Sequence, residues 1–199
     1  MPRYRRLHSG DLPAETVDLA RALIGCALVR DCPDGRTAGR IVETEAYVLD
    51  DPASHAYTGP SKRNASMFLE PFHAYVYKIY GTSFCVNVTS ETKGQGAAVL
   101  IRALEPLEGV GFMEERRRTT RMRDLCRGPG RVCQALSIDL DLDGADLLSA
   151  STLWLAATPT TADSVGKSRR IGISKAAERL LRFYERGNPF VSGPKALSS

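Results

Sequence analysis

The chain has 199 residues, of which 43% are hydrophobic and 25% are charged. These values exclude a largely disordered or collagen-like chain and fit one domain over residues 1–199, with short flexible termini at about 1–6 and 194–199. The five cysteines are odd in number and lack CxxC spacing, which argues against a zinc ribbon or a secreted disulfide scaffold. No stretch approaches 18 apolar residues, so no membrane span is expected.

The first half of the chain predicts one helix followed by strands. Residues 11–24 form an apolar stripe that starts with Pro13 and ends before Gly25, as a helix would. Residues 26–30 and 38–48 then flank the turn sequence CPDGRT, which predicts a hairpin. A second hairpin is expected from residues 73–80 and 84–89, and a further strand from residues 97–104.

The second half predicts more helix. Residues 105–109 lead into a helix that ends in an arginine block, and GPGRVCQALSI (128–138) opens as a short helix with Gly and Pro. LWLAA (153–157) and RRIGIS (169–174) are expected strands, whereas AAERLLRFY (176–184) fits either a helix or a strand. This order predicts an α+β fold with helices around a largely antiparallel sheet.

The net charge of +4 is unevenly distributed. Residues 1–60 carry −2, whereas residues 116–131 carry +6 and residues 167–186 carry +5. Two basic blocks on a nearly neutral body suggest a surface that faces a polyanion. Solvated helix faces explain the same charges equally well.

The segment IVETEAY (41–47) is the first candidate for chemistry. Because side chains alternate along a strand, Glu43, Glu45 and Tyr47 share one face with Ile41. Alternate Cα atoms are about 6.6 Å apart, which overlaps the carboxylate spacing of inverting glycoside hydrolases. A catalytic pair and a solvent-facing strand both remain open on this evidence.

Aromatic and polar residues elsewhere add further candidates. Tyr75 and Tyr77 share a strand face, and Tyr80 stands at a hairpin tip, where an exposed ring could act as a wedge between bases. His55, in a polar loop, could serve as an acid, a base or a stacking partner. Asn87 and Arg102 interrupt apolar strands; a buried polar side chain needs partners, so both could line a polar site.

Taken together, the motifs closely resemble the alkyladenine (3-methyladenine) DNA glycosylases of the type without a helix-hairpin-helix. The resemblance runs from about Leu7 to Gly193 and rests on eight ordered blocks: IVETEAY, the following His55, KRNASMF, YVYKIYG with CVN, LIRALEP, GPGRVCQAL, RIGIS and LRFYERGNPFVS. It implies a single compact domain around a curved, mainly antiparallel sheet with a protruding hairpin. It also implies that no metal and no cofactor are used.

The resemblance assigns roles residue by residue. Glu45 matches the general base that activates water, and Arg102 and the main-chain carbonyl of Ile171 match groups that hold this water. The walls of the flipped-base pocket match Tyr47, His55 and Tyr77. Asn87 matches the residue that disfavours the amino group of guanine, and Tyr80 matches the wedge. The candidates for phosphate contact are Lys62, Arg63, Arg127 and Arg131. Glu43 matches no catalytic residue.

The implied function is a monofunctional DNA glycosylase. We expect it to flip alkylated or deaminated purines (3-methyladenine, 7-methylguanine, hypoxanthine and ethenoadenine) out of double-stranded DNA and to excise them by water attack on C1′. A monomer is expected, cytoplasmic and nucleoid-associated in a bacterium or nuclear in a eukaryote. An inverting glycoside hydrolase that uses Glu43 and Glu45, and a non-catalytic module that binds DNA damage, remain the alternatives.

Overall fold

The structure is a computed structural model that describes residues 4–79, 81, 83–159, 162 and 164–193. Its helices and strands are joined by turns and short 3₁₀ segments. In chain order they are β1 (Arg5–Arg6), α1 (Thr16–Ala22), β2 (Ala27–Cys32), β3 (Gly35–Tyr47), β4 (Ala74–Ile79), β5 (Ser83–Thr89), β6 (Ala98–Glu108), α2 (Val110–Arg117), α3 (Pro129–Leu136), β7 (Leu153–Ala157), β8 (Val165–Ser168) and β9 (Arg182–Glu185).

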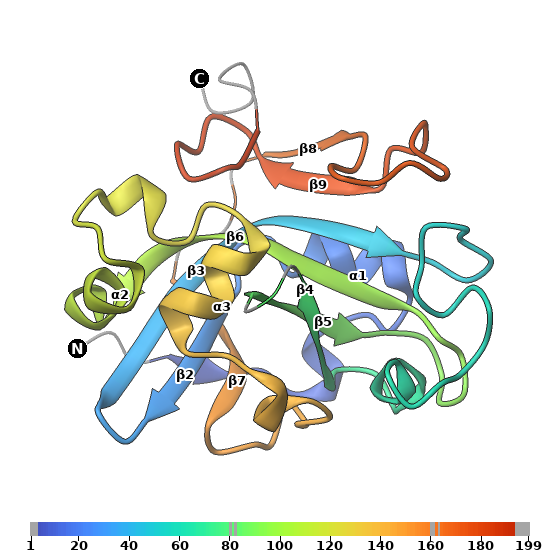
Figure 1. The fold of residues 1–199 in the computed structure, drawn as a ribbon, viewed down its shortest axis with the longest axis horizontal. Coiled ribbons are helices and arrows are strands. Elements are labelled where there is room, and N and C mark those ends of the chain that lie inside the picture. Colours follow the sequence, from blue (N-terminus) through green and yellow to red (C-terminus); the bar gives the residue numbers. More distant parts are fainter. Residues whose placement is uncertain (1–3, 80, 82, 160–161, 163, 194–199) are drawn as a thin grey trace.

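One antiparallel sheet organises these elements, in the order β1-β7-β2-β3-β6-β5-β4. The long strand β3 pairs with β6 along one edge. Its other edge is shared, because residues 35–40 pair with β2 and residues 43–45 pair with β9. The β8–β9 ribbon therefore branches from the second half of β3, as the orange and red strands of Figure 1 show. The expected α+β class is confirmed.

Helices cover the sheet and close the core. α1 contacts β3 and β6, and Thr44 Oγ1 donates a hydrogen bond to the main-chain oxygen of Ala20 at 2.8 Å. α3 contacts β5 and β6 and lies in front of the sheet in Figure 1. Apolar side chains from both helices and from β3, β5 and β6 form the main core cluster. All five cysteines are free.

Most expected elements are confirmed, with four differences, of which three concern the extent of an element. The first helix is shorter than residues 11–24, since its N-cap is Glu15, whose side chain accepts a hydrogen bond from the Asp18 N–H. Residues 176–184 contribute only the strand β9 at their end. Arg5 and Arg6, expected in a flexible terminus, pair with β7 as the strand β1.

The expected strand over residues 169–174 is wrong. The strand lies earlier, at β8, and residues 169–174 form an irregular loop. Tertiary contacts remove this segment from any ladder, because the Ile171 N–H donates to a carboxylate and Gly172 has a φ of 80°. Local β-propensity is overridden by these contacts.

The junction between β6 and α2 generates a stability prediction. Gly109 has a φ of 71°, and a Cβ added there would collide with the main-chain oxygen of Arg36. We expect Gly109→Ala to lower the free energy of unfolding by about 2–3 kcal/mol, measured by urea denaturation. Gly111→Ala is the matched control, because a Cβ there meets nothing within 4 Å. It should be neutral or stabilise the helix by about 0.5–1 kcal/mol, and equal losses in both variants would contradict the prediction.

Candidate active site

An open cavity of about 570 Å³ lies where β3, β4, β5 and β6 meet two loops. The first loop follows β3 and carries Pro52 to His55, and the second, residues 171–175, precedes β9. The candidate residues that line the cavity are Tyr47, His55, Arg63, Tyr77, Asn87, Arg102 and Ile171. The fold thus brings together residues that are up to 124 positions apart in sequence, as Tyr47 and Ile171 are.

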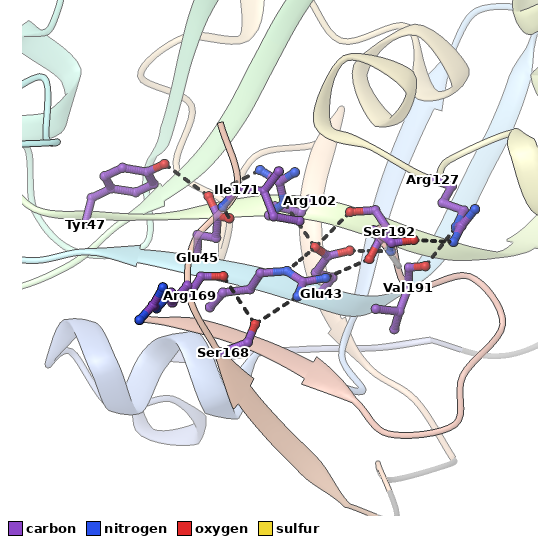
Figure 2. Close-up of polar contacts among 12 residues, drawn as sticks. Glu43, Glu45, Tyr47, Arg102, Arg127, Ser168, Arg169, Ile171, Val191 and Ser192 are labelled. Atoms are coloured by element: carbon purple, nitrogen blue, oxygen red, sulfur yellow. Dashed lines mark hydrogen bonds and ion pairs between the residues drawn. The ribbon is translucent and has the colours of Figure 1, made fainter. Parts of the chain in front are cut away.

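Glu45 is fully buried at the wall of this cavity, behind three of its lining residues. The Ile171 N–H donates to Glu45 Oε1 at 2.7 Å, and the Tyr47 hydroxyl donates to Oε2 at 3.1 Å. Arg102 completes the set, with its Nη1 3.2 Å from Oε2 (Figure 2). The carboxylate is therefore fixed in place beside the cavity, with lone pairs left for a further donor.

Burial and the hydrogen-bonding partners of Glu45 have opposite effects on the pKa of its carboxyl group. Burial raises the pKa of the carboxyl, because removing a charge from water disfavours the ionised form. Arg102, the Ile171 N–H and the Tyr47 hydroxyl oppose this shift, and the raised pKa is the net result. A raised carboxyl pKa at a cavity wall makes Glu45 a candidate general base or acid.

Glu43, two residues earlier, is closed off from the cavity by its own partners. Arg182 Nε and Arg102 Nε donate to its Oε1 at 2.6 and 3.1 Å, and Ser192 donates through its N–H to Oε2 and through its hydroxyl to Oε1. Register shifts in the β3–β6 pairing lie on either side of Glu43. Such irregularities re-aim side chains, and here Arg102 contacts both glutamates.

The segment around Ser192, near the C-terminus, makes further contacts with the residues that surround Glu43. Arg182 Nη2 donates to the main-chain oxygen of Ser192 at 2.7 Å, and its Nη1 donates to Ser168 Oγ at 2.9 Å. Arg127 Nε holds the oxygen of Val191 at 2.8 Å (Figure 2). The segment around Ser192 is therefore tied to three separate parts of the chain. None of these contacts was expected from the sequence.

The aromatic candidates gather on one side of the cavity. The His55 and Tyr77 rings meet edge to face with centroids 4.5 Å apart, and Tyr77 lies 5.3 Å from Tyr75. His55 Nδ1 is 2.9 Å from the hydroxyl of Tyr75, so this buried tyrosine orients the imidazole. Burial, with a smaller contribution from Arg63, lowers the pKa of His55 and favours the neutral ring.

Asn87 lies on β5 with its side chain buried against the cavity. Its Nδ2 donates to the main-chain oxygen of Tyr75 at 2.9 Å. This bond fixes the amide, because one donor of the group is committed to the neighbouring strand β4. The discrimination against guanine that the sequence resemblance implies for Asn87 stays a prediction.

The candidates for phosphate contact differ in their surroundings. Arg63 lines the cavity and Lys62 is exposed beside it. Arg131 is exposed and paired with Asp124 at 3.2 Å. Arg127 instead holds the main-chain oxygens of Val191 and Gly193, so its guanidinium has a structural use. Phosphate contact by all four stays a prediction.

The arginine block of residues 116–131 is in part a set of internal connections. Arg116 donates to the Ala135 oxygen and to Asp34, and Arg117 donates to the Leu125 oxygen. Arg123 donates to the oxygen of Pro189. The solvated-face interpretation is therefore too simple for these side chains, which join α2 and its following loop to neighbouring segments.

Other features bear on the remaining predictions. Tyr80, the expected wedge, lies outside the described residues. Within the described ranges, no three His, Cys, Asp or Glu side chains are grouped to hold a metal ion. In the same residues, no helix has the length and apolar character to cross a membrane.

Sequence reasoning missed one buried ion pair beside the cavity. Arg170 and Asp51 are both fully buried and bonded to each other, and the Arg170 guanidinium lies over the Tyr47 ring. The available signal was weak, because Asp51 sits in a polar loop and Arg170 sits in a basic block. Only contact across 119 positions distinguishes this pair from solvated charges.

Comparison with known proteins gives consistent matches. The profile of the methylpurine-DNA glycosylase family matches residues 11–189. A Mesorhizobium japonicum protein with the provisional name 3-methyladenine DNA glycosylase is 56% identical over 187 residues, covering 94% of this chain and 90% of that protein. A Paraburkholderia phytofirmans protein with the same provisional name is 49% identical, with coverages of 94% and 88%. The DNA-3-methyladenine glycosylase of Mus musculus is 45% identical over 208 residues, covering 93% of this chain and 62% of the mouse protein.

The two glutamates of β3 should differ in their effect on stability. Glu43→Gln leaves Arg182 and Arg102 short of a buried counter-charge, so it should lower the free energy of unfolding by about 3–5 kcal/mol. Glu45→Gln removes a charge whose burial raises its pKa, while Arg102 keeps Glu43 as partner. It should therefore maintain or increase stability at neutral pH.

The pH dependence of that gain has a definite sign. Because the pKa of Glu45 is raised in the folded state, ionisation of Glu45 lowers the free energy of unfolding. This loss is complete at pH values above the folded-state pKa and absent below the unfolded-state pKa of about 4.3. Any advantage of Glu45→Gln should therefore disappear as the pH falls below that value. Chemical denaturation of both variants across pH measures this, and equal losses in the two would assign Glu45 a purely structural role.

Proposed function

Since the chain belongs to the methylpurine-DNA glycosylase family, we propose that it excises alkylated and deaminated purines from double-stranded DNA by hydrolysis of the N-glycosyl bond. Membership confirms the resemblance that the sequence motifs indicate. The substrates we propose are 3-methyladenine, 7-methylguanine, hypoxanthine and ethenoadenine. The observation that carries the mechanism is the buried Glu45 carboxylate, held by Ile171, Tyr47 and Arg102 at the wall of the cavity.

The cavity can receive a base only after the nucleotide leaves the helix. The glycosidic bond of a stacked base is inaccessible, so enzymes of this kind rotate the nucleotide out of the duplex, which costs a few kcal/mol. We propose that Tyr80 fills the vacated space, and that Lys62, Arg63, Arg127 and Arg131 contribute phosphate contacts that fix register without reading sequence. Arg63 is the best placed of these, because it lines the cavity.

In the flipped state, the base stacks against Tyr47, His55 and Tyr77. Purines alkylated at N3 or N7 carry a positive charge, which electron-rich ring faces attract. Hypoxanthine and ethenoadenine are neutral and rely on the same stacking without that attraction. The His55 and Tyr47 rings are already ordered by their hydrogen bonds to Tyr75 and Glu45, so little entropy is lost when a base enters.

Glu45 then acts on water. An ionised carboxylate accepts a proton from a water molecule that attacks C1′, and its charge stabilises the oxocarbenium-like sugar as the base leaves. In this structure the Ile171 N–H is bound to Glu45 itself, so the proposed water contact of the Ile171 carbonyl is additional to it. The products are the free base and an intact abasic site, with no Schiff-base step.

The alternatives fit the geometry less well. An inverting glycoside hydrolase needs two carboxylates facing one substrate, whereas Glu43 is enclosed by Arg102, Arg182 and Ser192. A non-catalytic module that binds damage would leave the raised pKa and fixed carboxylate of Glu45 without a use. A monomer acting on DNA alone remains part of the proposal.

The general-base role of Glu45 has a direct test. Glu45→Gln keeps the size of the side chain but removes the proton acceptor, so single-turnover excision of hypoxanthine should fall by roughly 10²–10⁴-fold or more. Binding to the same duplex should persist. Excision is read after alkali cleavage of the abasic site, and strand breakage without alkali would contradict the proposed products.

A matched control for that experiment is Glu115→Gln, which changes an exposed carboxylate on α2 outside the cavity. It should leave excision unchanged. Glu43→Gln should reduce excision far less than Glu45→Gln at a temperature where both are folded. A near wild-type rate for Glu45→Gln would overturn the assignment, and an equal loss at Glu43 would favour the paired-carboxylate mechanism.

Asn87 is proposed to exclude normal guanine. Guanine carries an N2 amino group that hypoxanthine lacks, and the fixed amide of Asn87 would clash with it or leave a donor unpaired, at a cost of about 1–3 kcal/mol. Asn87→Ser should keep hypoxanthine excision and release guanine from G·T mismatches, measured in single turnover. An active variant that still excludes guanine would place the discrimination at other groups of the cavity.

A further inference from the structure

The Arg170–Asp51 pair stands immediately behind one wall of the cavity. Both side chains are completely buried, and the two guanidinium nitrogens Nη1 and Nη2 bond the two carboxylate oxygens of Asp51. Nη1 also donates to the main-chain oxygen of Ala46 at 3.0 Å. The guanidinium is thereby held in one orientation, which a flexible surface arginine would not keep.

That orientation places a positive charge against Tyr47. The Arg170 Cζ lies 4.7 Å from the centroid of the Tyr47 ring. Tyr47 lines the cavity but Arg170 does not, so the guanidinium covers the ring from the protein interior. The ion pair acts as a fixed dipole, and its positive member lies against the ring. Burial makes such a field stronger than it would be in water.

A base in the cavity would stack on the free face of the same ring. A cation on one face of an aromatic ring weakens the attraction of the ring quadrupole for a second cation on the other face. The two positive charges also repel each other across the ring. A neutral damaged purine experiences neither effect. Without Arg170, the Tyr47 ring would strongly prefer a positively charged base to a neutral one. Arg170 on the opposite face of the ring reduces that preference.

We propose that Arg170 is a specificity-determining residue that shifts the balance of the pocket away from positively charged alkylated purines and toward neutral damaged purines. This inference rests on the proposed function, since it concerns which flipped bases the same cavity accepts. The residue acts through Tyr47 and touches no substrate. It adds to the stacking and amino-group discrimination already described, because it separates bases by charge rather than by shape.

The Arg170–Asp51 pair also positions neighbouring residues of the site, and this effect must be separated from the effect of its charge on base preference. Arg170 immediately precedes Ile171, whose N–H holds Glu45. Asp51 begins the turn toward His55 and accepts a hydrogen bond from the Ala53 N–H at 3.1 Å. Loosening the pair would therefore weaken binding and excision of every base alike. The ratio between a charged and a neutral base is insensitive to that common loss, and it is the quantity to measure.

The experiment uses the full chain with Glu45→Gln, so that binding is measured without excision. Fluorescence anisotropy gives Kd for one duplex with hypoxanthine and one with 7-methylguanine on a 2′-fluoro sugar, which resists spontaneous base loss. The assay is run at mildly acidic pH, where the methylated base keeps its charge. Asn87 is the same in all proteins compared, so its effect on the amino group cancels.

Three changes are compared in that background. Asp51→Asn/Arg170→Gln removes both charges together and should shift the Kd ratio toward 7-methylguanine by about 2- to 30-fold, the range of one cation–π interaction. Asp51→Asn alone leaves the guanidinium uncompensated and should shift the ratio the opposite way. Arg170→Lys keeps the charge and should weaken both duplexes with the ratio unchanged. Thermal unfolding verifies that each variant is folded.

The outcomes separate the two proposals. An unchanged ratio in the double variant, or the same shift in Arg170→Lys, would overturn the charge role of Arg170. If the double variant does not fold, the opposite shift of Asp51→Asn decides the matter. Failure of the proposed function shows differently, because the chain with Glu45 intact would then excise neither hypoxanthine nor 7-methylguanine.

Discussion

The structure depends on burying two carboxylates of one strand beside two arginines. Glu43 and Glu45 come from β3, and their charges are balanced by Arg102 from β6 and Arg182 from β9. Isolated ions in such a position would cost many kcal/mol, and even a pair must be fully hydrogen-bonded to be tolerated. The four groups are formally neutral together, and Arg102 is shared between the two glutamates.

This balance explains features of the fold that would otherwise be unrelated. The pairing of β3 with β6 shifts register around Glu43, and Arg102 there contacts both carboxylates. β9 leaves the main order of the sheet to pair with residues 43–45 and bring Arg182 to them. The segment near the C-terminus then supplies Ser192 as the last donors to Glu43. Glu43 is satisfied completely, whereas Glu45 keeps capacity for a further donor.

The division between the two glutamates is a division between stability and chemistry. Glu43 fixes Arg102, and Arg102 with Ile171 and Tyr47 fixes Glu45. Behind Tyr47, the buried Arg170–Asp51 pair holds the two loops that line the cavity. Catalytic groups need such supporting contacts, since a displacement of about 1 Å can cost about a hundredfold in rate. The site is thus ordered before any base enters.

The sequence by itself determined the fold class, the two hairpins, the long strands and α3, because alternation, turn residues and Pro129 are local signals. The resemblance of its motifs also pointed to seven residues that the fold gathers around one cavity. Tertiary structure decided the rest. The irregular loop over 169–174, the enclosure of Glu43 and the Arg170–Asp51 pair depend on partners more than 100 positions away. A charged residue in sequence looks the same whether it is solvated or buried, and only the position of its counter-charge distinguishes the two.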